Sequence, residues 1–226
     1  YDLAYCHDGY VRNNKMYTAE IYNGWFAIVD VSNKANIGSA QVMGTGSTTL
    51  SFTHNIWISD DSNYAFTTDE LANANVDAYD ISDLQNIRRL DTYRPLETEG
   101  LGVIPHNTHY LNGFLITSWY TDGIVIVDAT RPDNLIKVGS YDSETEFTSG
   151  FEGMWGAYPY LPSGLIIGGD LNNGLYVLQP RDHQGNPGYQ RASYLEGKIT
   201  DVNTGASISN VAVIILGQES NGDFSN

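Results

Sequence analysis

Cysteine is nearly absent from this chain of 226 residues, in which Cys6 is the single copy. One thiol cannot form an internal disulfide, so packing and hydrogen bonds have to stabilise the fold. Basic residues are also scarce: 11 Lys and Arg stand against 27 Asp and Glu, and the formal net charge is −16. This balance argues against binding to nucleic acid and to anionic membrane surfaces, which both depend on clustered Lys and Arg. It fits a solubilising surface, an extracellular protein or a protein that takes up cations.

Long hydrophobic runs are missing as well. No apolar segment approaches the ~20 residues of a membrane helix, so membrane insertion is not expected. No stretch has the periodicity of an amphipathic helix. The chain starts at Tyr1 without a signal-peptide pattern, from which we expect a processed chain or a fragment. The GxSxG elbow, the Walker-type loop and the Rossmann fingerprint do not occur, so nothing supports nucleophilic catalysis or nucleotide binding.

Short segments rich in β-branched and aromatic residues make up most of the chain. Examples are residues 15–22 (KMYTAEIY), 25–31 (WFAIVDV) and 114–120 (FLITSWY), which are bounded by Gly, Asn or Asp. This pattern is typical of β-strands. The dipeptide Asn112-Gly113 lies between two such segments and is a strong signal for a two-residue hairpin, because both positions accept a positive φ. Hydrophobic residues amount to 41% of the chain, which is enough for one large all-β domain.

Two features recur at intervals of about fifty residues along the chain. An Asp closes a strand at Asp30, Asp80 and Asp128. A His opens a strand at His7, His54 and His106. Each repeat can be divided into four antiparallel strands, and repeats of this kind with a period of ~40–50 residues are typical of β-propeller blades. A β-sandwich would explain the density of strands, but it would explain neither recurring feature.

The predicted fold is therefore all-β, a propeller of four-stranded blades followed by a truncated β-sandwich module. We predict blades near residues 6–50, 51–104, 105–150 and 151–180, within a propeller region that covers residues 1–180. Closed rings typically have ~4–8 blades, so this set forms either a compact ring or part of a larger one, and we expect further blades upstream. The segment YDLAY would be the outer strand of such an earlier blade.

After Pro180 the composition changes to a polar connector with Gly and Pro, for which we predict residues 181–192. Residues 193–226 then contain two strand-like segments around a DVNTGA turn. This length is too short for an independent sandwich. We expect an incomplete sandwich, or poorly ordered chain, over this region.

The longest repeat strings resemble a known family. These strings are THNIWISDDSNYAFTTDE, PHNTHYLNGFLITSWYTDGIVIVDATRPDNLIKVGSYD and WGAYPYLPSGLIIGGDLNNGLYVL. They are similar to the LVIVD-repeat proteins and, more narrowly, to the choice-of-anchor B surface proteins common in Bacteroidota. The segment YLEGKITDVNTGASISNVAVIILG resembles the start of a carboxypeptidase-regulatory-like domain. The resemblance implies a secreted propeller on the outer cell surface, and it implies little about activity.

A more distant likeness connects THNIWISDDSNYAFTTDE and AYDISDL to the selenium-binding, methanethiol-oxidase-type propellers. In that group, axial His and acidic residues are associated with a metal. Propeller geometry gives the recurring histidines a location, because the innermost strand of each blade lines the axis and each His opens that strand.

The strand pairing inferred from the turns assigns carboxylates to the histidines. It predicts Glu20 opposite His7, and Asp69 opposite His54 with Glu70 adjacent. It also predicts Trp119 opposite His106, and Asp170 opposite Gly156. The candidate metal ligands are therefore His7, His54, His106, Glu20, Asp69 and Glu70. Imidazole with carboxylate suits Zn, Cu, Fe or Mn in the axial pocket, and binding should weaken as the pH falls through the histidine range near ~6.5.

Structural explanations compete with the metal site. A recurring His can hydrogen-bond the backbone of the neighbouring blade, as the histidine of WD-type repeats does. We expect His109 and the four Trp residues to pack between blades, and His183 to be solvated. A carbohydrate platform formed by Trp119, Tyr120 and Trp155 is a further alternative. The acidic loops DDSN (60–63) and DLNNG (170–174) are candidates for Ca²⁺, but they lack EF-hand spacing and are more often plain turns.

Two functions follow from these features. The first is a secreted or cell-surface propeller that serves as a binding or display module, with other cell-surface proteins or glycans as partners. The alternative is a metal-dependent enzyme, similar to an oxidoreductase, that uses the axial His and carboxylate cluster.

Overall fold

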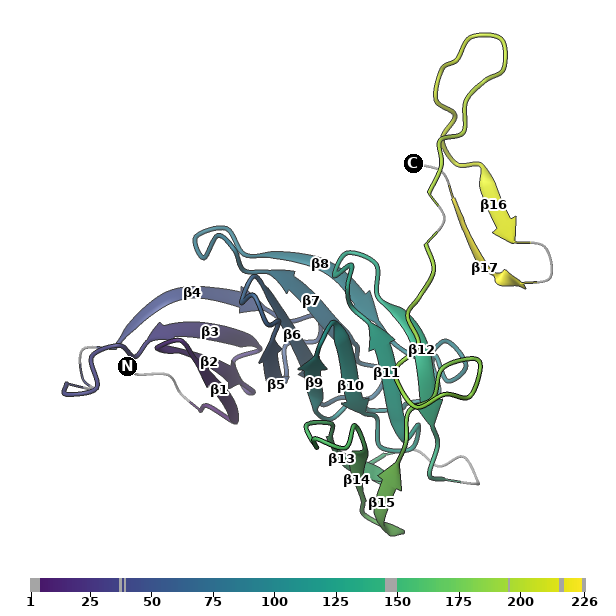
Figure 1. The fold of residues 1–226 in the computed structure, drawn as a ribbon. Helices are drawn as coiled ribbons and strands as arrows, with labels where there is room; N and C mark the ends of the chain where they lie inside the picture. Colours follow the sequence, from purple (N-terminus) through teal and green to yellow (C-terminus); the bar gives the residue numbers. More distant parts are fainter. Residues whose placement is uncertain are drawn as a thin grey trace. The chain divides into compact units, whose positions relative to one another are not determined.

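The computed structural model of the chain describes residues 5–36, 38, 40–144, 150–194, 196–215 and 218–224. These residues fold into antiparallel β-sheets and contain no α-helix, as the sequence predicted (Figure 1). The described part therefore offers no helix that is long and apolar enough to cross a membrane. The chain divides into two compact units, Tyr1–Ala192 and Ser193–Asn226.

Within the described residues, the first unit has three four-stranded sheets and one three-stranded sheet, and the strands of each sheet follow chain order. The first sheet contains β1 (Asp8–Arg12), β2 (Lys15–Glu20), β3 (Trp25–Asp30) and β4 (Gln41–Ser47). The second contains β5 (Thr53–Ile58), β6 (Tyr64–Asp69), β7 (Val76–Asp80) and β8 (Arg88–Tyr93). The third contains β9 (Thr108–Leu111), β10 (Phe114–Ser118), β11 (Ile124–Asp128) and β12 (Ile136–Tyr141). The last contains β13 (Met154–Tyr158), β14 (Ile166–Asp170) and β15 (Gly174–Leu178).

Local turn chemistry fixes these hairpins. Asn13 and Asn14 have φ angles of 51° and 61° between β1 and β2, and Asn112 and Gly113 have 50° and 84° between β9 and β10. Both turns therefore place two consecutive residues in the left-handed region, as two-residue hairpins with a matching twist require.

The recurring Asp is a turn residue. The Oδ1 atoms of Asp30, Asp80 and Asp128 accept hydrogen bonds from the backbone N–H two residues later, at 2.8, 3.0 and 2.9 Å respectively. This is the Asx turn by which Asp ends a strand and redirects the chain. The common Asp that identified the repeat is thus explained by local structure and needs no functional role.

The core lies between successive sheets. One cluster joins Phe26 and Ile28 of the first sheet to Ile56 of the second, and other clusters join the second to the third and the third to the fourth. The innermost strands β1, β5, β9 and β13 contact one another in that order, so the sheets are stacked like propeller blades (Figure 1). A sandwich, in which two sheets share one interior, does not have this arrangement.

The last sheet has three strands where the others have four, and β15 forms its edge. Residues 180–192 instead run back to the third sheet. There the Arg191 guanidinium lies 3.3 Å from Oδ1 of Asp128, and the backbone N–H of Ala192 donates to Oδ2 at 2.9 Å. The predicted connector is therefore packed against the third sheet, and it belongs to the same compact unit as the sheets.

In the described part of the second unit, β16 (Ala212–Ile215) pairs with β17 (Gln218–Phe224) in an antiparallel hairpin. A bridge between Thr200 and Ser207 closes the predicted DVNTGA turn. That this unit begins a carboxypeptidase-regulatory-like sandwich stays a prediction, as do the exact blade and connector boundaries.

Candidate metal centre

Each innermost strand starts with an irregular residue, which we call its head residue: His7, His54, His106 and Trp155. In the second sheet Thr53 pairs with Asp69 and Asn55 pairs with Thr68, so His54 is left between the two pairs in a β-bulge. In the fourth sheet Met154 pairs with Asp170 and Gly156 pairs with Gly169, which leaves Trp155 in the same position. A bulge re-aims the side chain that it carries.

The other two heads have the same backbone pattern. The N–H of His7 donates to the carbonyl oxygen of Ala19, although Ala19 is already paired with Asp8. The N–H of His106 donates to the carbonyl oxygen of Ser118, whose own N–H donates to Asn107. The inner strand thus has one extra residue at every head.

These bulges correct the predicted pairing. Asp69 lies opposite Thr53 and not opposite His54, and Asp170 lies opposite Met154 and not opposite Gly156. At the third head, the backbone hydrogen bonds go to Ser118 and not to Trp119. The regular ladder of the first sheet ends at Asp8 and Ala19, so Glu20 has no regular pair with His7. Counting from the turns fails at the heads because each bulge inserts one residue.

The head side chains form a continuous series of rings across the four sheets. The ring centroids of His7 and His54 are 4.1 Å apart, those of His54 and His106 are 4.5 Å apart, and those of His106 and Trp155 are 5.1 Å apart. The prediction that the three histidines occupy equivalent positions at the starts of three inner strands is therefore confirmed by the geometry.

Hydrogen bonds between sheets hold the heads in place. The side-chain amide of Asn55 donates to the Asp8 carboxylate at 2.7 Å, and its oxygen accepts from the N–H of Thr108 at 2.9 Å. The hydroxyl of Thr68 donates to the carbonyl oxygen of His106 at 2.5 Å. Three consecutive inner strands are thereby connected next to the histidines.

His54, Glu70 and His106 bring one potential metal-ligating atom each to within 4.8 Å of the other two. The Nε2 atom of His54 lies 3.5 Å from Oε2 of Glu70, and the Nε2 atom of His106 lies 3.7 Å from Oε1. The phenol of Tyr120 donates to Oε1 at 2.6 Å. Among the residues that the structure describes, this is the one group of at least three His, Cys, Asp or Glu donors so closely spaced.

Both imidazoles of this group are buried, with 3% of each residue exposed. Burial lowers the pKa of His54 to about 4, and the neighbouring His7 contributes in the same direction. Burial likewise lowers the pKa of His106 to about 4, with His54 as the second cause. Both rings are therefore uncharged at neutral pH, which is the form that coordinates metals. Proton competition is expected nearer pH 4 than at the ~6.5 of an unperturbed His.

The donor set fits a metal ion. The Nδ1 atoms of His54 and His106 make no hydrogen bond of good geometry within the described residues. His54 nevertheless interacts with the backbone of His106 and the side chain of Asn107, and His106 interacts with the backbone of Trp155, so the burial of the rings is partly compensated. The Nε2 atoms of both rings face the Glu70 carboxylate. A cation or a proton between the nitrogens and the carboxylate is needed to make this approach favourable. Two imidazoles and one carboxylate form the protein ligand set of catalytic zinc sites and of non-haem iron sites.

Three of the six predicted metal ligands lie outside this group. The Nδ1–H of His7 donates to the carbonyl oxygen of His54 at 3.1 Å, which is the backbone contact that the structural explanation expects. The Asp69 carboxylate accepts from the Thr48 hydroxyl and the N–H of Leu50, both at 2.6 Å, and so orders a loop. Glu20 is fully buried and does not belong to the close group.

The sequence indicates Tyr120 only as a neighbour of Trp119 and as a member of the alternative carbohydrate platform, not as a partner of a metal ligand. It has a φ of 39°, which is rare for an aromatic residue, and its ring lies 5.3 Å from the His106 ring. Such strain persists where the surroundings fix it, often at functional sites. The signal for Tyr120 in the sequence was its position at the end of a strand beside a head, but its contact with Glu70 depends on the packing of two sheets.

The remaining candidates have structural roles. His109 packs against Trp57 and Tyr160 from neighbouring sheets, with centroid distances of 4.7 and 5.7 Å. In the acidic loops, Oδ1 of Asp61 accepts from the N–H of Asn63, and Oδ1 of Asp170 accepts from the N–H of Asn172. Both carboxylates thus stabilise their own turns, and no close three-donor group forms in these loops as far as the structure describes them.

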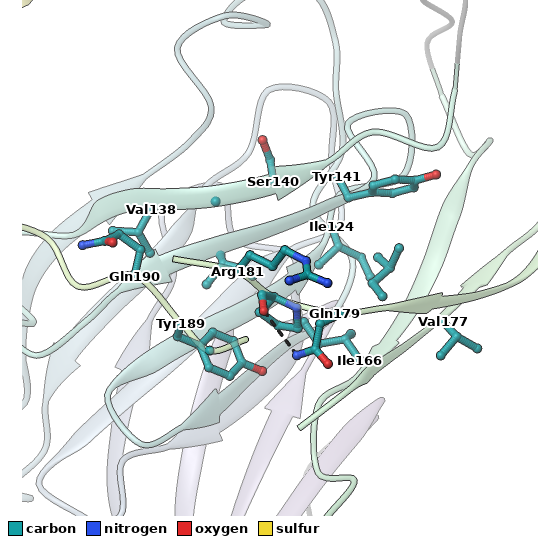
Figure 2. A pocket seen from close by; sticks show the side chains of 15 residues that line it. Ile124, Val138, Ser140, Tyr141, Ile166, Val177, Gln179, Arg181, Tyr189 and Gln190 are labelled. Atoms are coloured by element: carbon teal, nitrogen blue, oxygen red, sulfur yellow. Dashed lines mark hydrogen bonds between the residues drawn. The ribbon is translucent and has the colours of Figure 1, made fainter. Parts of the chain in front are cut away.

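A separate cavity of about 340 Å³ lies between the third and fourth sheets (Figure 2). Its walls are apolar residues of β11, β12, β14 and β15, and the segments 179–181 and 188–190 line it as well. It contains no residue of the His54–Glu70–His106 group, and it adjoins the edge strand β15. The other sheets have a fourth strand beside their third, so we interpret the cavity as incomplete blade packing.

Comparison with known proteins supports the fold. No protein-family model matches the chain, and no curated protein does. The periplasmic gluconolactonase PpgL of Pseudomonas aeruginosa matches with a TM-score of 0.63 and 17% identity, over 82% of this chain and 52% of that one. A putative 6-phosphogluconolactonase from Bacteroides uniformis matches with a TM-score of 0.59 and 16% identity, over 81% and 53%. The computationally designed Ika4 protein matches with a TM-score of 0.56 and 9% identity, over 78% and 92%.

The chain spans about half the length of the two lactonase structures. Identities this low show the fold alone, and they show it to be a β-propeller-like all-β fold. The narrower resemblance to LVIVD-repeat and choice-of-anchor B proteins stays a prediction, because no family model matches.

Proposed function

We propose that this chain is the metal-binding part of an exported, metal-dependent β-propeller enzyme, in which His54, Glu70 and His106 hold one transition-metal ion. The observation that carries the proposal is the convergence of two uncharged Nε2 atoms on one carboxylate, with the three donors within 4.8 Å of one another. Three protein ligands leave coordination positions open, as catalytic sites do.

The residues of the group have separate roles in this proposal. His54 and His106 supply neutral nitrogen ligands, and Glu70 supplies the negative charge that a divalent ion needs. The Tyr120 hydroxyl donates to Glu70 and so orients the carboxylate, as the second shell of a metal site usually does. When bound, Zn²⁺, Fe²⁺, Mn²⁺ or Cu²⁺ would act on a substrate as a Lewis acid, and the three redox-active ions would add electron transfer.

Two further observations support an exported enzyme. Both lactonase structures similar in fold are named as enzymes, and one of them is described as periplasmic. The resemblance of the repeats to surface proteins supports a position on the outer cell surface. The competing proposal is a metal-free binding or display module, and the backbone contact of His7 favours it, since this ring is held without a metal.

Metal analysis tests the proposal. Protein purified without chelators or a His-tag and incubated with Zn²⁺, Fe²⁺, Mn²⁺ or Cu²⁺ should retain one ion per chain after desalting, as measured by inductively coupled plasma mass spectrometry. His54→Ala and Glu70→Gln should each lose the ion, with unchanged far-UV circular dichroism. His183→Ala is the matched control, because His183 is exposed and distant in sequence from the group. Absence of metal from the wild-type protein under all four conditions would favour the display module instead.

A further inference from the structure

Trp155 occupies the head position of the fourth sheet, where the other three sheets have a histidine. The sequence suggested that this Trp packs between blades, but 53% of the residue is exposed. By contrast, 1% of Trp119 is exposed, so Trp119 is a packing residue and cannot form a surface platform. A bulge of the kind that turns the imidazoles toward one another in the other sheets turns the indole of Trp155 toward the edge of the metal centre.

The exposed indole is held by a rigid backbone. The residue before it, Met154, exchanges two backbone hydrogen bonds with Tyr120, at 2.8 and 3.1 Å. The carbonyl oxygen of Trp155 accepts from the Ser118 hydroxyl at 3.0 Å, and its ring lies 5.1 Å from the His106 ring. A large aromatic surface that is exposed and already ordered is suited to binding, because little conformational entropy remains to be lost.

A second exposed aromatic ring lies beside the same group. Phe151 is 59% exposed, and its ring meets the Tyr120 ring edge-on at a centroid distance of 5.4 Å. Tyr120 in turn donates to Glu70. Two exposed aromatic side chains, Trp155 and Phe151, thus flank a carboxylate and two imidazoles. We call these two side chains the aromatic rim.

The chemistry of these residues restricts the ligand. None of the residues of the group or of the rim is Lys or Arg, and the chain has a net charge of −16, so an anionic ligand is disfavoured. Glu70 and the imidazoles hydrogen-bond to hydroxyl groups, whereas the indole requires an apolar face. The half-exposed rim suits a ligand that keeps most of its surface polar, since purely apolar ligands are bound in enclosed apolar pockets.

We infer that the rim is a carbohydrate subsite, in which the apolar face of a neutral pyranose ring stacks on Trp155 while its hydroxyls reach Glu70, the partly exposed member of the His54–Glu70–His106 group. This inference rests on the proposed metal centre for the position of the hydroxyls. The stacking on Trp155 and Phe151 depends on the rim alone. The inference assigns neutral glycans as the substrate class of the site.

Calorimetric titration with neutral sugars tests the subsite. The probes are methyl hexopyranosides and their β-1,4-linked disaccharides, added to the Zn²⁺-loaded wild-type chain. Trp155→Ala should weaken binding at least tenfold, and Trp155→Phe should weaken it less than threefold, while bound Zn²⁺ stays at the wild-type level in both variants. Tyr158→Ala is the matched control, because Tyr158 is 50% exposed on the same strand but is not a head residue, and it should bind like the wild type.

The outcomes separate the two proposals. No binding of any pyranoside at 50 mM, an affinity unchanged by Trp155→Ala, or Trp155-dependent binding of phenol in preference to the sugars would overturn the subsite. None of these results would affect a measured metal content. Conversely, a chain that binds no metal but binds pyranosides through Trp155 would retain the rim and reject the metal centre.

Discussion

The phenol of Tyr120 donates a 2.6 Å hydrogen bond to Oε1 of Glu70, and so connects residues that follow strands β10 and β6 of two different sheets. Removing the hydroxyl by Tyr120→Phe keeps the buried ring but releases the carboxylate. We expect the metal affinity to fall about 10–100-fold, the usual effect of losing an outer hydrogen bond to a ligand. Competition with a chromogenic chelator measures the change.

Tyr160→Phe is the control for that experiment. The Tyr160 hydroxyl also donates a hydrogen bond, to the carbonyl oxygen of Tyr110 at 2.8 Å, but it lies outside the metal centre. Its removal should leave the metal affinity unchanged. Equal losses in the two variants would mean that the phenol of Tyr120 stabilises the fold and not the carboxylate.

His109 should make the fold sensitive to acid. Burial lowers its pKa to about 4, and the Asp8 carboxylate only partly opposes this shift. The unfolded chain takes up a proton on this ring near pH 6.5, whereas the folded chain does so only near pH 4. The unfolded state therefore binds more protons in this window, so the free energy of unfolding decreases as the pH falls from about 6.5 through 4.

Urea unfolding of His109→Gln at pH 7 and pH 5 measures this contribution. The wild type should lose about 1–2 kcal/mol more than the variant over this interval, as expected for one half-buried imidazole. His183→Gln, a change at an exposed ring, should leave the pH dependence as it is in the wild type. If His109→Gln has the wild-type dependence, then His109 does not stay neutral in the folded protein.

The sequence was sufficient to predict the fold because its signals are local. The pair Asn112-Gly113 specifies a hairpin whatever surrounds it, and the Asp that closes each repeat makes an Asx turn with residues two positions later. The closing Asp recurs in the first three sheets and the two-residue turn in the first and third, so these signals predicted four-stranded repeats without any tertiary information. The three-stranded last sheet was less predictable, because a missing strand leaves no local pattern.

The candidate site was only partly predictable, because a bulge changes the pairing by one residue. The common His showed that the three rings occupy equivalent positions, but counting from the turn placed Asp69 opposite His54. Glu70, one residue further on, faces both imidazoles instead. Features that depend on how the sheets stack, such as the exposure of Trp155, have no signature within a single repeat.

Asp128 differs from the other recurring Asp residues because two segments depend on it. Its Oδ1 accepts from the Thr130 N–H and hydroxyl, at 2.9 and 2.6 Å, as the turn requires. Its Oδ2 accepts from the N–H of Ala192 at 2.9 Å, and the Arg191 guanidinium lies 3.3 Å from Oδ1. The Asp128 side chain is 1% exposed, whereas the Arg191 side chain is 45% exposed, so the buried hydrogen bonds are the contacts that water replaces least easily.

Asp128→Asn should destabilise the fold by about 1–3 kcal/mol, because the new amide group opposes the N–H of Ala192 and the contact with the half-exposed Arg191 loses its charge. Asp30→Asn is the matched control. Asp30 makes the same turn through the Ser32 N–H, and an Asn oxygen can accept that bond, so the change should stay within about 0.5 kcal/mol. Urea unfolding at pH 7 compares the two variants. Similar values for both would show that the segment ending at Ala192 does not depend on Asp128, and would contradict its packing against the third sheet.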